Sequence, residues 1–110
     1  MQIKKTYYNI KPELLYDELR DLILKRGTVI GATKFETYSL PTDSSSSISR
    51  GTLTFLTGGK ESVRAHLIGS AVGEMKLMFD IDENLFAPDK IKAMQEDLDF
   101  IFSKYEGEPQ

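Results

Sequence analysis

The sequence predicts an α+β domain in which two helices pack on one face of a mainly antiparallel sheet, as a two-layer sandwich. Two apolar stripes at helical spacing, one in each half of the chain, predict the two helices. Between them lie segments rich in β-branched and aromatic residues, separated by glycine or serine turns, which predict neighbouring strands. One more such segment opens the 110-residue chain, so the expected order of elements is β-α-β-β-β-β-α.

The first two elements are a strand over residues 3–10 and a helix that begins near Pro12. Proline suits the first position of a helix, where its missing N–H group is not needed. Lys25 and Arg26 are expected in the last turn, and Gly27 is expected to end the helix in a left-handed conformation. The apolar stripe of this helix consists of Leu15, Leu19, Leu22 and Ile23.

Three strands are then expected over residues 28–40, 48–57 and 61–68. The first alternates poorly, so its two faces cannot be assigned from the sequence. Residues 41–47 carry a proline, an aspartate and four serines, and this composition predicts a flexible loop. Gly58 and Gly59 predict a tight hairpin turn between the second and third of these strands.

Residues 74–81 alternate most clearly and predict the last strand, with Met75, Leu77, Phe79 and Ile81 on one side. Pro88 opens the second helix, whose apolar residues recur at spacings of three and four up to Tyr105. Gly107 is expected to end it. We therefore expect one domain over residues 1–106 and a frayed tail over residues 107–110.

Composition excludes several classes of site. The chain has no cysteine and only one histidine, which excludes disulfides, thiolate metal sites and sites that need two imidazoles. Its formal net charge is −3, which argues against nucleic acid as a partner because nucleic-acid-binding domains are usually basic. The apolar runs are too short for a membrane span, and no apolar run follows the N-terminal lysines, so we expect a soluble, cytoplasmic protein that does not bind membranes.

Three motifs that suggest chemistry lack essential residues. Gly58-Gly59-Lys60 is followed by Glu61 rather than by the hydroxyl residue of a phosphate-binding loop. The acidic run 80–84 lacks the glycine and the bidentate glutamate of a calcium loop. His66 has no nucleophile elbow near it in the sequence. We predict no catalytic, metal or nucleotide site, no cofactor and no enzymatic activity.

The side of the sheet away from the helices is the most informative feature. Alternation places long basic residues there together with apolar and aromatic ones, a mixture typical of the central part of protein interfaces. The interface candidates are Arg50, Arg64, His66, Lys76 and Met78. We expect a non-enzymatic binding domain that uses this face to self-associate or to bind a protein partner. The alternatives are a pocket for a small apolar or anionic ligand between the sheet and the C-terminal helix, nucleic-acid binding on the basic and aromatic residues, and a solvated face without a partner.

The element order resembles one half of the TATA-binding-protein fold, which has a strand, a helix, a run of strands and a final helix. It is also similar to the helix-grip lipid-binding folds, in which a long C-terminal helix lies over a sheet. The first resemblance implies an open sheet face, and the second implies a ligand beneath the last helix. Both are similarities of element order, without a shared motif.

Overall fold

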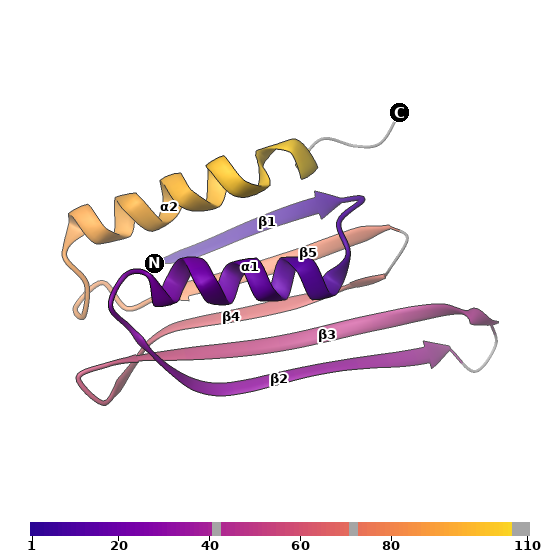
Figure 1. The fold of residues 1–110 in the computed structure, drawn as a ribbon, viewed down its shortest axis with the longest axis horizontal. Helices are drawn as coiled ribbons and strands as arrows, with labels where there is room; N and C mark the ends of the chain where they lie inside the picture. Colours follow the sequence, from indigo (N-terminus) through magenta and orange to yellow (C-terminus); the bar gives the residue numbers. More distant parts are fainter. Residues whose placement is uncertain (41–42, 71–72, 107–110) are drawn as a thin grey trace.

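A computed structural model describes residues 1–40, 43–70 and 73–106. Its elements follow the predicted order (Figure 1): β1 (Gln2–Tyr8), α1 (Pro12–Leu24), β2 (Val29–Leu40), β3 (Asp43–Thr57), β4 (Lys60–Ser70), β5 (Glu74–Ile81) and α2 (Pro88–Phe102). A single turn of 3₁₀ helix, Ser103–Tyr105, follows α2. The five strands form one antiparallel sheet in the order β1-β5-β4-β3-β2.

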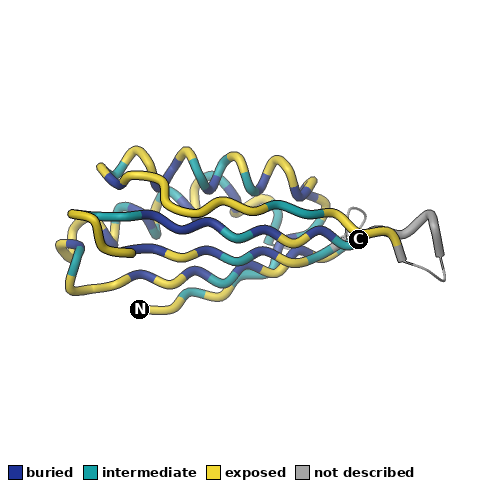
Figure 2. Tube along the Cα trace, turned by 90° about the horizontal axis from the view of Figure 1, so that it is seen from below, coloured by how far each residue is buried: buried dark blue, intermediate teal, exposed yellow. Residues whose placement is uncertain are grey.

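Both helices lie on one side of this sheet (Figure 2). Buried residues alternate strictly with more exposed ones along β5, and β3 and β4 depart from this alternation at Thr54 and Ser62, which are also buried. The apolar stripe of α1 and the inward residues of β3, β4 and β5 belong to one buried cluster. The apolar residues predicted for each helix contact this cluster, because residues that repeat every three or four positions lie on one face of a helix. The predicted α+β two-layer sandwich is therefore confirmed.

The helix α2 lies over β1. The rings of Tyr7 and Phe102 are 5.3 Å apart between centroids. Lys5 Nζ lies 3.4 Å from Asp99, which belongs to α2, and 3.1 Å from Glu106, which follows α2 in the chain. The hydrogen bond with Glu106 raises the pKa of Lys5, and the nearby Asp99 acts in the same direction. An apolar contact and an ion-pair network thus fix α2 on this outer strand.

The turns match the residues that form them. Gly58 and Gly59 have φ values of +58° and +79°, as the hairpin between β3 and β4 requires. Gly27 has φ +85° after α1, which confirms the predicted left-handed position. The helix ends at Leu24, so the prediction that Lys25 and Arg26 lie in its last turn is wrong. Arg26 instead pairs with Asp97 of α2 and joins the two helices.

The Ser-rich segment departs from the sequence prediction. Residues 43–47 continue β3, with Asp43 opposite Leu40 and Ser47 opposite Ser39, whereas a flexible loop was predicted over 41–47. The end of β2 pairs with both ends of this stretch, and this pairing outweighs the weak strand preference of serine. Residues 41–42 and the predicted tail at 107–110 lie outside the described residues.

Candidate functional site

The open face is the side of the sheet that neither helix covers, and the strand registers place its side chains in rows across the five strands. Three consecutive rows are Gln2-Asp80-Arg64-Thr54, Lys4-Met78-His66-Thr52-Lys34 and Thr6-Lys76-Ile68-Arg50-Glu36. All five interface candidates of the sequence analysis lie on this face. Tyr38 and Tyr8 also belong to it, whereas Tyr7 points into the core and is fully buried.

A hollow of about 370 Å³ lies at the β1 side of the open face. We call it the Met78 hollow, and its open-face residues are Lys4, Thr6, His66, Ile68, Lys76 and Met78. Met78 and His66 are half-buried, while Ile68 remains 40% exposed. The hollow therefore combines an apolar centre with lysines around it.

The cations of this region differ in how they are neutralised. Lys76 Nζ lies 3.6 Å from Glu74, an exposed pair that holds the lysine only weakly. Lys4 and Arg50 form no ion pair with any residue that the structure describes. Arg50 lies opposite Ile68 in the next strand. Glu36 lies opposite Arg50 on the other side but is paired with Lys34. The apolar centre is thus flanked by two positive charges that form no ion pair with a described residue.

His66 sits in the middle of the second row. Its Nδ1 lies 3.3 Å from the hydroxyl of Thr52, and Met78 is its neighbour on β5. Within residues 1–40, 43–70 and 73–106, no carboxylate is hydrogen-bonded to the imidazole, so nothing there orients it as a general base. His66 is thus a half-buried polar residue of the open face.

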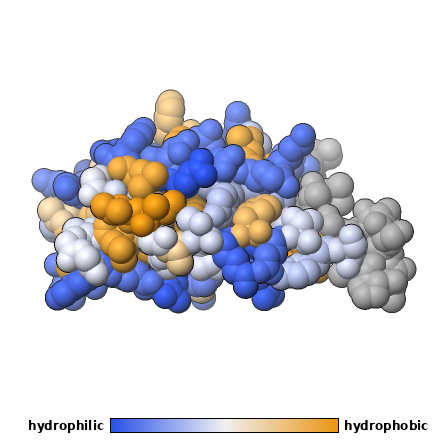
Figure 3. Space-filling model, turned by 60° about the horizontal axis from the view of Figure 1, so that its bottom comes forward, coloured by the Kyte–Doolittle hydropathy of each residue, from blue (hydrophilic) through white to orange (hydrophobic). Residues whose placement is uncertain are grey.

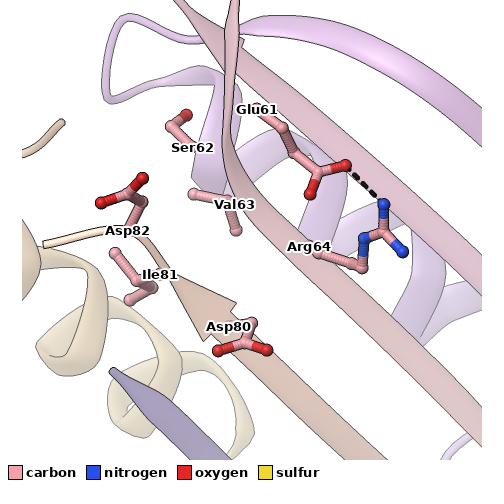
Figure 4. A pocket seen from close by; sticks show the side chains of 7 residues that line it. All are labelled: Glu61, Ser62, Val63, Arg64, Asp80, Ile81 and Asp82. Carbon is pink, nitrogen blue, oxygen red and sulfur yellow. Dashed lines mark hydrogen bonds and ion pairs between the residues drawn. The ribbon is translucent and has the colours of Figure 1, made fainter. Parts of the chain in front are cut away.

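Arg64 lies apart from the Met78 hollow, in a second hollow of about 400 Å³ at the start of β4 and the end of β5 (Figure 4). Its guanidinium nitrogen Nη2 donates to Glu61 at 2.7 Å, and this hydrogen bond raises the pKa of the arginine. Asp80 and Asp82 line the same hollow. The sequence analysis grouped Arg64 with the other candidates, but the structure places it among acidic residues.

The acidic residues of the second hollow do not form a metal site. Figure 4 shows the carboxylates of Glu61, Asp80 and Asp82 pointing in different directions. In the described part of the chain, no group of three or more histidine, aspartate or glutamate residues could hold a metal ion.

No helix among the described residues is long and apolar enough to cross a bilayer.

The space between the sheet and α2 is small. Ile3, Lys5, Gln95, Leu98 and Asp99 line a gap of about 150 Å³ there. Sites for small ligands usually measure roughly 300–1,000 Å³. Leu98 and Phe102 fill the interior at this place, since each is only 1% exposed. A larger hollow of about 360 Å³ lies beside the first turns of α2, with Met1, Phe86 and Ile91 among its lining residues. The ligand pocket between the sheet and the C-terminal helix stays a prediction.

Lys4 and Ile68 belong to the Met78 hollow but were not among the sequence candidates. The sequence does not reveal that β1 pairs with β5, which is the last strand in the chain. For that reason Lys4 could not be predicted to lie beside Met78. Ile3, Lys5 and Tyr7 alternate with Lys4 along β1 and face the helices, and this alternation was the pattern that could have placed Lys4 on the open face.

Comparisons of the chain with protein-family models, with curated proteins and with solved structures found no match. The similarities to the TATA-binding-protein and helix-grip folds therefore rest on element order alone.

Proposed function

We propose that this chain is a non-enzymatic binding domain whose open face binds the surface of a partner protein through the Met78 hollow. The observation that carries the proposal is the position of Met78 and Ile68 between Lys4, Lys76 and Arg50 on a sheet face without a covering helix. Methionine and arginine are enriched at interfaces, and methionine adapts its shape to a partner.

The charges indicate the chemistry of the partner. Lys4 and Arg50 form no ion pair with a described residue, and Glu36, which lies opposite Arg50, is paired with Lys34. Carboxylates of a partner can therefore pair with both cations without displacing an existing ion pair. An aliphatic side chain of the partner would cover Ile68 and Met78. Two open faces placed against each other would bring their lysines and arginines together, so an acidic and apolar surface fits better than a second copy of this face.

A short acidic and apolar peptide tests the proposal directly. The probe is an acetylated, amidated pentapeptide of alternating glutamate and leucine, titrated into the ¹⁵N-labelled protein while the amide chemical shifts are followed. We expect shifts at Lys4, His66, Ile68, Lys76 and Met78, and binding that weakens from low to high salt because exposed charges are screened.

Two charge reversals separate the hollow from general attraction. Lys76→Glu should weaken the peptide affinity at least tenfold, because it places a carboxylate beside the probe. Lys90→Glu makes the same change of charge on an exposed lysine of α2 and should leave the affinity within about twofold. Equal effects of the two variants, or shifts confined to the helix side, would contradict the proposal.

A further inference from the structure

The strand β2 forms a long, uncovered edge of the sheet. It has 12 residues and pairs only with β3, so the other side of its backbone has no partner strand among the described residues. The opposite edge, β1, is shorter, with 7 residues, and α2 lies over it. Figure 3 shows the β2 side of the molecule, where apolar side chains gather toward one end. At the start of β2, the side chain of Val29 is 65% exposed and that of Ile30 is 37% exposed. Such an edge is a template for another strand.

The charges of β2 are arranged symmetrically about Phe35. Lys34 and Glu36 both lie on the open face, on either side of Phe35, which faces the helices beside Tyr16. Their charged groups are 2.8 Å apart within the strand. A two-fold axis through Phe35, perpendicular to the sheet, would place Lys34 of each copy opposite Glu36 of the other.

Symmetry allows few other registers. Antiparallel pairing of two identical edges about a two-fold axis keeps opposed residues on the same face, so the register can change only by two residues at a time. A shift of two in one direction places Lys34 opposite Lys34, and a shift of two in the other places Glu36 opposite Glu36. Like charges directly opposite each other destabilise strand pairing. Of these three central registers, only the one centred on Phe35 is free of like-charge pairs.

The other pairs of this register are compatible with it. Phe35 lies opposite Phe35 on the helix side, and Thr33 lies opposite Thr37. Aromatic pairs and threonine pairs both stabilise adjacent strands. Tyr38, which is half exposed, lies opposite the small side chain of Ala32. The irregularity of the β2-β3 ladder falls between Ile30 and Thr33, at the border of this stretch.

We propose that β2 is a homodimer interface, in which two copies pair edge to edge in antiparallel fashion with Phe35 on the two-fold axis. The five strands of each copy then form one continuous sheet. Because the axis is perpendicular to the sheet, all helices lie on one side and both Met78 hollows lie on the other. The dimer does not depend on the function proposed for the Met78 hollow, since β2 contributes no residue to that hollow.

Sedimentation equilibrium with a charge-complementation design tests the dimer. The wild type should show a concentration-dependent dimer between about 1 μM and 1 mM. Glu36→Lys, and separately Lys34→Glu, should each weaken dimerisation about 10- to 100-fold, since each turns both symmetry-related pairs into like charges. An equimolar mixture of the two variants should form a heterodimer near the wild-type affinity, because every opposed pair is again of opposite sign. The double variant with both changes should also dimerise.

The controls identify the surface. Lys90→Glu and Lys76→Glu, which change charge on α2 and on the open face, should leave the dimer affinity within about twofold. Circular dichroism of each variant verifies that it is folded. A wild type that stays monomeric to 1 mM, a dimer insensitive to Glu36→Lys, or a mixture of the two variants that stays monomeric would each overturn the proposal. A dimer lost in Lys76→Glu but kept in Glu36→Lys would assign self-association to the open face instead.

Discussion

Replacing Gly69 with alanine introduces a methyl group on β4 directly against the backbone of β5. A Cβ atom at this position would lie 2.2 Å from the carbonyl oxygen of Glu74 and 2.8 Å from the Cα of Met75. Carbon and carbonyl oxygen normally approach to about 3.3 Å, so the two backbones must separate by about 1 Å. Both atoms belong to the main chain of β5, which cannot move aside by a change of rotamer.

The expected cost follows from two opposing effects. Forced overpacking typically costs about 1–3 kcal/mol, and the need to move backbone places this substitution at the upper end. Alanine also lowers the conformational entropy of the unfolded chain, which stabilises the folded state by about 0.4–1 kcal/mol. We expect the free energy of unfolding to fall by about 2 kcal/mol, which corresponds to a melting temperature lower by roughly 8–16 °C. Urea unfolding followed by circular dichroism measures the first quantity, and a thermal scan measures the second.

Gly51→Ala provides a matched control on the same side of the sheet. Its Cβ atom would lie 3.1 Å from the ring of Tyr16, 3.2 Å from Leu67 and 3.3 Å from the ring of Phe35. These neighbours are ends of side chains, which can shift by a few tenths of an ångström, so the loss should stay under about 1 kcal/mol. The reasoning is refuted if Gly51→Ala costs as much as Gly69→Ala, or if Gly69→Ala leaves the stability unchanged.

Three further predictions concern the core and the contact between the helices. Burial, and to a lesser degree nearby carboxylates, raises the pKa of Tyr7 in the folded protein. The pKa of tyrosine in the unfolded chain is about 10, so the free energy of unfolding should fall as the pH rises above about 10. The Tyr7 hydroxyl is buried and has no hydrogen-bond partner in the described part of the chain. Tyr7→Phe should therefore not destabilise the protein at pH 7, and it should lose less stability than the wild type in urea titrations between pH 9 and 11. Leu98→Ala should cost about 2–4 kcal/mol in urea unfolding, whereas Phe100→Ala on the same helix, at a side chain 88% exposed, should change stability by less than about 0.5 kcal/mol. A double-mutant cycle of Arg26→Ala and Asp97→Ala should give a coupling free energy of about 0.5–1.5 kcal/mol, and a value near zero would show that this half-buried pair does not help to hold the two helices together.

Periodicity was sufficient to predict the layers of this fold. The stripe of α1 and the alternation of β5 are strong patterns, and both predicted the buried side correctly from single residues such as Leu19 and Phe79. The alternation from Arg64 to Met78 likewise placed the interface candidates on the face away from the helices. These features depend on local sequence, in which burial imposes a regular spacing.

Features that depend on pairing between distant segments could not be predicted. The sequence did not reveal that β1 lies beside β5, which brings Lys4 next to Met78. It did not reveal that Arg64 turns toward Glu61, because that choice depends on the local register of the β3-β4 hairpin. The composition of residues 41–47 predicted a loop, whereas pairing of Ser47 with Ser39 and of Asp43 with Leu40 brings residues 43–47 into β3. Composition describes a segment in isolation, and strand pairing depends on what lies beside it.

The position of β1 also determines the order in which this chain can assemble. The strands from β2 to β5 are successive neighbours in the sequence and in the sheet, so each can pair as soon as it has been synthesised. By contrast, Gln2 pairs with Asp80 and the amine of Met1 donates to the carbonyl of Ile81, so β1 cannot pair until β5 has been synthesised. Closing a loop of this length is the slow kind of step in folding, because its entropy is lost before any contact compensates for it. During synthesis, the first strand to be made is therefore the last to be joined to the sheet, and until then the inward side of Tyr7 and the adjoining edge of β5 are exposed to other chains.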